Sequence, residues 1–325
     1  MRFSGNRKLY TLAAVISVFL LFLAGCKQEN ESARKHYVAI ITKSMDSAFW
    51  KSVYAGAGAA ATEYNLQVSM EGPEREEDYE AQNRMIRRAV AEGAEAIVFS
   101  AVDYNANCEA INEAARKGVK IVVIDSDVNS SQVSCRIGTD NLEAGRMAGY
   151  AALKAESGAL YIGIVNYDIN SANGQQREEG FREVAGEDAR VKDMYTINVL
   201  SATEDAREGT VALLREHPEI NVVVAFNEWT SLGVGWAIRD LGLADKTQVV
   251  AFDSNVVSVG MLETGEVDAL IVQNPYAMGY LGVEESYRLI NGGSGNGAVI
   301  DTATTCVTRE NMFEPECQRA LFAFD

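Results

Sequence analysis

From residue 37 onward, short apolar segments alternate with longer segments in which apolar residues recur at helical spacing. The short segments suit buried strands of a parallel sheet, which are covered on both faces. Strands separated by helices imply parallel sheets joined by right-handed crossovers. We expect strands at residues 37–41, 66–70, 96–100, 121–124, 159–165, 194–200, 222–226, 249–252 and 269–272. We expect helices at residues 49–64, 81–90, 105–117, 142–156, 173–185, 204–217, 230–241 and 256–264, the third with Asn105 as its N-cap.

The sequence also contains an internal echo. Val122-Val-Ile-Asp-Ser126 in the first half parallels Val250-Ala-Phe-Asp-Ser254 in the second, and each follows a helix and a turn. A chain of this length exceeds one typical hydrophobic core. We therefore predict an α/β protein made of two similar Rossmann-like lobes, each built on a parallel sheet.

The first 26 residues have the three-part order of a secretory signal peptide. Arg2, Arg7 and Lys8 form a basic start, an apolar run from Leu9 to Leu23 follows, and Leu-Ala-Gly-Cys26 comes next. The apolar run is short for a helix that crosses a bilayer, which disfavours the alternative of an uncleaved membrane anchor. We assign residues 1–25 to the signal peptide and residues 26–36 to a polar tether.

The end of this leader resembles the lipobox of bacterial lipoproteins. The resemblance implies that Cys26 is acylated and becomes the new N-terminus. It also implies that the protein is anchored by lipid to the bilayer, outside the cytoplasmic membrane, on the outer face or in the periplasm.

The charge balance is strongly acidic. The formal net charge of the whole chain is −17, and loss of the three basic residues of the leader makes it −20. Such a surface repels phosphate backbones, so we expect no binding of nucleic acid.

The remaining cysteines and histidines give no metal signature. Cys108, Cys135, Cys306 and Cys317 form no C-x-x-C motif, and His36 and His217 are the only histidines. We therefore expect no metal site. An exported chain can hold disulfides, and pairing of Cys306 with Cys317 stays open at this stage.

Polar and aromatic side chains follow seven of the expected strands. In open parallel sheets, ligands bind outside the carboxyl ends of the strands. Carboxylates, amides and a guanidinium pair well with hydroxyl groups, and flat rings stack on the apolar face of a sugar-like ring. An alternative for Asp125 and Asp253 is that each caps a following helix. The strand-end groups are Lys43, Asp46, Ser47, Phe49, Trp50, Ser100, Asp103, Asp125, Ser126, Asp127, Asn166, Asp168, Arg177, Asn227, Glu228, Trp229, Asp253, Gln273 and Asn274.

From about Tyr37 to its end the chain resembles the type I periplasmic binding proteins of the ribose-binding-like, sugar-uptake group. The resemblance rests on the order and spacing of seven short stretches. These are Ile40–Trp50, Val122–Asp127, Gly138–Asn141, Gln176–Phe181, Ala225–Glu228, Val250–Asp253 and Val272–Pro275. The resemblance implies a hinge of three crossings, near Asp140–Asn141, Gln273–Asn274 and Thr302. It implies an N-terminal lobe of residues 37–140 with 274–302 and a C-terminal lobe of residues 141–273 with 303–325.

The same resemblance implies a set of ligand-binding residues. Phe49 and Trp50 are expected to stack on the ligand. Hydrogen bonds to hydroxyl groups are expected from Asp125, Arg177, Asn227, Asp253 and Gln273. Ser47 and Ser100 stand where pentose binders often carry amides, and Ser126 stands where they often carry an arginine. Lys43 and Asp127 are similar to residues of members that bind rhamnose-like sugars or furanose-derived quorum signals.

The resemblance implies the receptor of an ABC sugar importer. It is expected to capture a monosaccharide or similar polyhydroxy ligand, to use no cofactor, to deliver the ligand to a membrane permease and to act as a monomer. Alternatives are a receptor that serves a sensor kinase or a chemoreceptor, and a binder of a furanose-derived quorum signal. The sequence has no G-x-S-x-G elbow or phosphate loop, so we do not expect an enzyme. Too few residues precede the first strand for the DNA-binding domain of the related lactose-repressor family.

Overall fold

The computed structural model describes residues 35–155 and 158–322, and the described residues from His36 onward form one compact unit. The predicted signal peptide, Cys26 and nearly all of the tether lie outside the described residues. Among the described residues, no helix combines the length and the apolar character that crossing a membrane requires.

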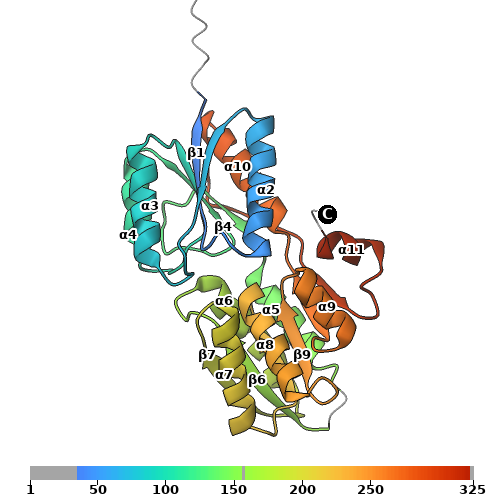
Figure 1. Ribbon diagram of the computed structural model, residues 1–325. Helices are drawn as coiled ribbons and strands as arrows, with labels where there is room; N and C mark the ends of the chain where they lie inside the picture. The colour runs from blue at the N-terminus through green and yellow to red at the C-terminus, as the bar shows by residue number, and fades with distance from the viewer. Residues whose placement is uncertain (1–34, 156–157, 323–325) are drawn as a thin grey trace, which may run out of the picture. The chain divides into compact units, whose positions relative to one another are not determined.

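The first sheet has six strands, and every neighbouring pair in it is parallel. Its strand order is β11-β5-β4-β3-β1-β2. Side chains alternate along each strand, so the sheet buries both faces. Helices α2 and α10 cover one face, and α3 and α4 cover the other (Figure 1). The bounds are β1 Tyr37–Ile41, α2 Ala48–Glu63, β2 Gln67–Glu71, α3 Tyr79–Ala91, β3 Ala96–Phe99, α4 Cys108–Arg116, β4 Lys120–Ile124, β5 Cys135–Gly138, α10 Pro275–Ile290 and β11 Ala298–Asp301.

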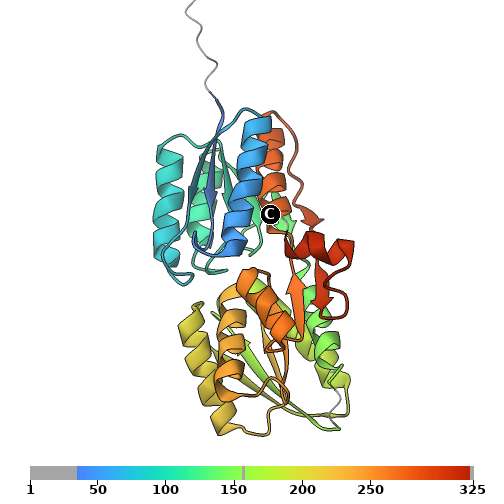
Figure 2. The same ribbon diagram turned by 45° about the vertical axis from the view of Figure 1, so that its right-hand side comes forward.

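The second sheet also has six strands, in the order β12-β10-β9-β8-β6-β7. Only the edge pair of β10 and β12 is antiparallel. Helices α5 and α6 cover one face, whereas α7, α8, α9 and α11 lie on the other (Figure 2). The bounds are α5 Asn141–Ala152, β6 Leu160–Asn166, α6 Ala172–Glu187, β7 Val191–Asn198, α7 Thr203–Glu216, β8 Val222–Ala225, α8 Glu228–Leu241, β9 Gln248–Phe252, α9 Val256–Thr264, β10 Ala269–Val272, β12 Thr305–Thr308 and α11 Pro315–Leu321.

We call each sheet with its covering helices a lobe, the N-terminal lobe for the first and the C-terminal lobe for the second. The chain passes between the lobes three times, after β5, after β10 and after β11. The prediction of an α/β fold with two parallel-dominated sheets is confirmed. The exact residue ranges of the two domains stay a prediction.

Glycines bring two helix pairs into close contact at equivalent places in the two lobes. In the pair α5 and α6, a Cβ at Gly145 would collide with the Arg177 carbonyl, and one at Gly180 with the Leu142 carbonyl. In the pair α2 and α10, Gly56 and Gly279 approach the partner backbone in the same way. Small residues therefore let the backbones meet, and this contact fixes the depth of α6, which carries Arg177.

Some expected elements differ from those observed. The predicted N-cap Asn105 is wrong, because α4 begins at Cys108 with Asn107 at its N-cap. The Asp103 carboxylate accepts the amides of Asn105 and Ala106 at 2.8 and 2.7 Å, so a turn occupies this stretch.

The remaining differences concern edge strands and helix ends. The predicted helix at 142–156 ends earlier, at Ala152, and the predicted strand at 194–200 begins earlier, at Val191. β7 is an edge strand with alternating exposure, so its polar start lacks the apolar run that marks a buried strand. The short strands β5, β11 and β12 and the helices α10 and α11 were not predicted. Cys108, Cys135, Cys306 and Cys317 are free thiols, so the pairing of Cys306 with Cys317 is not formed.

Candidate functional site

A small cavity of about 30 Å³ lies where the two lobes meet, at the carboxyl ends of their strands. The lining combines four carboxylates, two cations, amides, hydroxyls and aromatic rings. These residues are Lys43, Ser47, Phe49, Trp50, Glu76, Asp125, Tyr167, Asn173, Arg177, Asn227, Glu228, Trp229, Asp253 and Gln273.

Asp125 and Asp253 occupy equivalent positions after β4 and β9. Both have a positive φ, 56° and 68°, a left-handed conformation that is uncommon outside glycine and asparagine. Each amide donates to a carbonyl of the neighbouring strand, Asp125 to Ile137 at 3.1 Å and Asp253 to Ile271 at 3.0 Å. The alternative that either residue caps a following helix is wrong, because β4 is followed by a strand and α9 is capped by Asn255.

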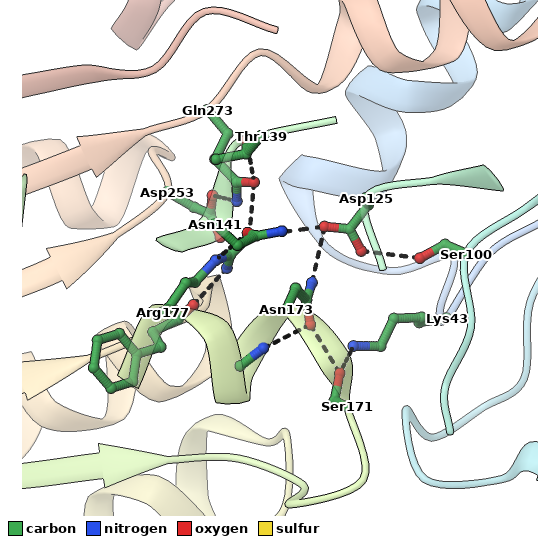
Figure 3. Close-up of polar contacts among 12 residues, drawn as sticks. Lys43, Ser100, Asp125, Thr139, Asn141, Ser171, Asn173, Arg177, Asp253 and Gln273 are labelled. Carbon is green, nitrogen blue, oxygen red and sulfur yellow. Dashed lines mark hydrogen bonds and ion pairs between the residues drawn. The ribbon is translucent and has the colours of Figure 1, made fainter. Parts of the chain in front are cut away.

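The Asp125 carboxylate is hydrogen-bonded at both oxygens. Ser100 donates to Oδ2 at 2.9 Å, and Asn173 of the other lobe donates to Oδ1 at 3.0 Å (Figure 3). The Arg177 guanidinium adds an ion pair at 3.8 Å. Asp125 is therefore held in one orientation by groups from both lobes.

Arg177 is fully buried and organises the centre of the site. Its Nε donates to Asn141 Oδ1 at 2.8 Å, Nη1 donates to the Phe226 carbonyl at 2.6 Å, and Nη2 donates to Gln273 Oε1 at 2.7 Å (Figure 3). The guanidinium also lies over the Phe252 ring, 4.8 Å from its centroid. Asn141 and Gln273 stand on two of the passages between the lobes, so Arg177 ties the cavity to these connections.

The Asp253 carboxylate has fewer partners. Gln273 donates to Oδ1 at 2.6 Å, and among the described residues no group donates to Oδ2. Burial raises the pKa of Asp253 to about 7, while Arg177 and the Gln273 hydrogen bond oppose that rise. Asp253 thus presents a carboxyl oxygen to the cavity that can accept a hydrogen bond from a bound hydroxyl group.

Two aromatic rings at the start of α2 form one wall. The rings of Phe49 and Trp50 meet edge to face with centroids 4.8 Å apart, and both side chains are buried. Ser47 caps the helix by accepting the Trp50 amide at 3.1 Å. Trp50 Nε1 donates to Glu76 at 2.8 Å, which fixes the plane of the indole ring.

Lys43 reaches across the cavity from the N-terminal lobe. Its ammonium group donates to Ser171 Oγ at 2.7 Å and lies 5.0 Å from the centroid of the Tyr167 ring. Asn173 Oδ1 accepts from both Ser171 and Tyr167 at 2.8 Å. These side chains form one polar network along the edge of the cavity.

The structure brings together most of the predicted ligand-binding residues. Asn227 lines the cavity, caps α8 through its Oδ1 and donates from Nδ2 to Ser201 Oγ at 2.7 Å. Ser100 lies behind Asp125 and supports it rather than lining the cavity. The residues on the wall are Lys43, Ser47, Phe49, Trp50, Asp125, Arg177, Asn227, Asp253 and Gln273.

Asp127 lies away from this cavity. Its carboxylate pairs with Arg136 of β5 at 2.9 Å and accepts the Val128 amide at 2.8 Å. It lines a separate surface hollow beside the first passage between the lobes. The structure therefore gives Asp127 a local structural partner instead of a place on the cavity wall.

Five further residues line the cavity but were not among the predicted ligand contacts: Glu76, Tyr167, Asn173, Glu228 and Trp229. Glu228 and Trp229 were among the strand-end groups listed from the sequence, and Tyr167 directly follows the end of β6, so a broader use of the strand-end rule finds it as well. Glu76 and Asn173 carry no such signal. Within the described segments, no cluster of histidine, cysteine and acidic side chains could hold a metal ion.

Comparison with known proteins gives consistent matches over most of the chain. A family model described as a periplasmic binding protein domain matches residues 38–294. The chain is similar to the D-ribose/D-allose-binding protein of Pseudomonas aeruginosa, with 25% identity over 291 residues that cover 86% of this chain and 90% of that protein.

Two solved structures are also similar. One is a carbohydrate transporter solute binding protein from Agrobacterium radiobacter in complex with D-arabinose, with 29% identity and a TM-score of 0.86. The match covers 89% of this chain and 99% of that one. The other is an ABC transporter solute binding protein from Agrobacterium vitis with bound D-fucose, with 26% identity and a TM-score of 0.84. That match covers 88% of this chain and 99% of the other.

Proposed function

The chain belongs to the periplasmic binding protein family, and from this premise we propose that it is the solute-binding protein of an ABC importer for a monosaccharide or a similar small polyhydroxy ligand. The observation that carries the proposal is the interlobe cavity, which combines two aromatic rings packed edge to face with carboxylate, amide and guanidinium groups. Such a lining matches a ring that has an apolar face and a rim of hydroxyl groups.

Binding follows from the chemistry of each group. Asp253 Oδ2 accepts a ligand hydroxyl, and Asn227 and Gln273 lie on the same wall to complete the hydrogen bonds. Phe49 and Trp50 supply the apolar face against which the sugar ring packs. Arg177 keeps the neighbouring carboxylates from repelling one another, because it stands between Asp125 and the Gln273–Asp253 pair.

The ligand is held by both lobes, so its binding favours the arrangement in which the lobes meet. The three passages after β5, β10 and β11 act as the hinge about which the lobes separate. Ligand capture is thus a shift of the hinge equilibrium, and the protein needs neither a covalent step nor a cofactor.

The predicted leader completes the assignment. An acylated Cys26, followed by the polar tether, anchors the protein to the outer side of the cytoplasmic membrane or in the periplasm. There it works as a monomer and presents the ligand to a membrane permease. Mass spectrometry of the purified protein tests the anchor, because a diacylglycerol-modified Cys26 at the N-terminus is the expected species.

A thermal-shift assay tests the proposed ligand class. The four sugars D-ribose, D-allose, D-arabinose and D-fucose, hereafter the sugar panel, are the ligands in the names of the three relatives above. A sugar at a hundred times its dissociation constant stabilises the folded state by about 2.7 kcal/mol. We expect one sugar of the panel to raise the melting temperature and to decrease the radius of gyration in small-angle scattering. No shift with any of the four contradicts the monosaccharide assignment.

A further inference from the structure

Four carboxylates line the cavity, and two of them, Glu228 and Glu76, join Asp125 in accepting hydrogen bonds from groups of the opposite lobe. Glu228 is the first residue of α8 in the C-terminal lobe, and Glu76 stands between β2 and α3 in the N-terminal lobe. Both are nearly inaccessible to solvent, with 6% and 8% of their surface exposed. A buried carboxylate is costly unless it is hydrogen-bonded, so the partners of these two residues show what they do.

Glu228 caps a helix that belongs to the other lobe. Its Oε1 accepts the Ala48 amide at 3.1 Å, and its Oε2 accepts the Phe49 amide at 3.0 Å. These are first-turn amides of α2, which have no partner within their own helix. The positive end of the helix dipole adds to the attraction. Asn255 Nδ2 donates to Glu228 Oε1 at 3.0 Å and so holds the carboxylate in place.

Glu76 makes the corresponding contact from the N-terminal lobe to the C-terminal lobe. Its Oε1 accepts Trp50 Nε1 at 2.8 Å within its own lobe, and its Oε2 accepts Ser201 Oγ of the C-terminal lobe at 2.7 Å. The neighbouring Glu77 accepts the Ser201 amide at 2.7 Å. Ser201 thus docks two of its polar groups on the N-terminal lobe.

We infer that Glu228 and Glu76 are positioning residues that latch the two lobes together on either side of the Phe49–Trp50 wall. Glu228 binds the first-turn amides of α2, and Glu76 binds the indole Nε1 of Trp50. The two residues therefore hold the aromatic wall in place when the lobes meet. Their oxygens are used by protein donors, and Asp253 keeps an oxygen for the ligand. The role of the latches in retaining a sugar rests on the proposed function.

The latches predict a particular kinetic effect. They form only when the lobes meet, which is after the sugar has entered the cavity. Their loss should therefore speed release far more than it slows capture. A hydrogen bond to a charged group contributes about 1.5–3 kcal/mol, so loss of one latch should raise the dissociation rate constant about tenfold or more.

Three variants weaken the latches, and Asn255→Asp does so without changing a residue of the cavity wall or the partner of Asn227. Ser201→Ala and Asn255→Asp each change a residue outside the cavity wall. Asn255→Asp keeps the oxygen that caps α9 but replaces the donor to Glu228 with a second carboxylate. Glu228→Ala removes the latch itself. Glu266→Gln is the matched control, because Glu266 has 8% of its surface exposed and its partner Arg239 lies in the same lobe.

Stopped-flow tryptophan fluorescence measures the result, because Trp50 and Trp229 line the cavity. Each variant is mixed with every sugar of the panel. We expect the dissociation rate constant to rise about tenfold in the three latch variants, with the association rate constant within about threefold of the original protein. Glu266→Gln should leave both constants unchanged. Unchanged dissociation in the latch variants, or an equal rise in Glu266→Gln, overturns the inference.

A second measurement keeps the latch testable without any sugar. If no panel sugar binds the original protein, the proposed ligand class fails, and amide hydrogen exchange then decides about the latch. We expect exchange at Ala48 and Phe49 to be faster in Glu228→Ala than in the original protein, while Trp50, capped by Ser47, changes little. Equal exchange at Ala48 and Phe49 in the two proteins overturns the latch.

Discussion

Asp125 and Asp253 stand at the ends of equivalent strands in the two lobes and share a left-handed backbone and a hydrogen bond to the next strand. Their side chains nevertheless meet different surroundings. Asp125 accepts hydrogen bonds from Ser100 and Asn173 and pairs with Arg177, whereas within the described residues the one hydrogen-bond donor to Asp253 is Gln273. A repeated backbone motif thus delivers two carboxylates to one cavity, and the neighbours decide how each is used.

Asp125 and Asp253 therefore have different roles. Asp125 links the lobes, because it accepts from Ser100 of the N-terminal lobe and from Asn173 of the C-terminal lobe. Among the described residues no group donates to Oδ2 of Asp253, and burial raises the pKa of this carboxyl group. A sugar hydroxyl that donates to Asp253 supplies what Asp125 already receives from the protein. The following predictions test this contrast, from the largest expected effect to the smallest.

Removal of Arg177 should have the largest effect, because both carboxylates depend on it. Arg177→Ala leaves buried carboxylates without their cation. It also removes the hydrogen-bond donor to Asn141, Gln273 and the Phe226 carbonyl. We expect a loss of about 3–5 kcal/mol in the free energy of unfolding, measured by urea denaturation without ligand. Arg177→Lys keeps the charge but not the planar fork and should lie in between. A loss below 1 kcal/mol in Arg177→Ala contradicts the central role of Arg177.

The pH dependence of stability should report Asp253. Because its pKa rises from 3.8 to about 7 on folding, the folded protein keeps a proton that the unfolded chain releases in this interval. The contribution of Asp253 is therefore fully present below about pH 4 and is lost as the pH rises through about 7. Asp253→Asn removes this loss. We expect the variant to gain about 2–3 kcal/mol relative to the original protein between pH 5 and pH 8, measured by urea denaturation. A constant difference at both pH values rejects the raised pKa.

Asparagine substitutions should separate ligand binding from stability. Asp253→Asn loses the anionic acceptor for the ligand, so affinity for the best panel sugar should fall about tenfold while the protein at neutral pH stays as stable or gains stability. Asp125→Asn replaces an acceptor with a donor beside Ser100 and Asn173, so it should also lower the free energy of unfolding by about 1–3 kcal/mol. Isothermal titration and urea denaturation measure the two quantities. Equal changes in affinity and in the free energy of unfolding for the two variants contradict the difference between Asp125 and Asp253.

Asp127 should show the smallest effect although it lies two residues from Asp125. Its pair with Arg136 is about one third exposed, and surface ion pairs contribute about 1 kcal/mol or less. Asp127→Asn should change the affinity for the same sugar less than about twofold. A larger change in affinity places Asp127 in ligand binding and rejects the surroundings described here.

The sequence predicted the fold and most of the cavity wall for two reasons. Parallel strands bring their carboxyl ends to one edge of each sheet, which singled out strand-end residues such as Asp125, Asn227 and Asp253 as candidates. The family resemblance implied that these residues and Arg177 face one ligand between the lobes. Ser100 and Asp127 also follow strands, but a strand end says nothing about which partner captures a side chain. Asp127 stands near Arg136, whose strand pairs with β4.

The latch residues show where prediction from sequence stops. Glu76 lies in a charged turn, and its contact with Ser201 joins residues separated by 125 positions. Glu228 follows a strand, yet its carboxylate oxygens accept hydrogen bonds from amides of α2 in the other lobe. Such contacts depend on how the two lobes meet, which no local pattern encodes.

Isothermal titration at pH 7 in two buffers of different ionisation enthalpy tests the assignment of Asp253 most directly. A hydroxyl that donates to the carboxylate favours its ionised form, so binding of the best panel sugar should release protons from the original protein. Asp253→Asn should bind the same sugar more weakly and release none through this group. Equal proton release by the two proteins contradicts the account, because the ligand then does not meet Asp253.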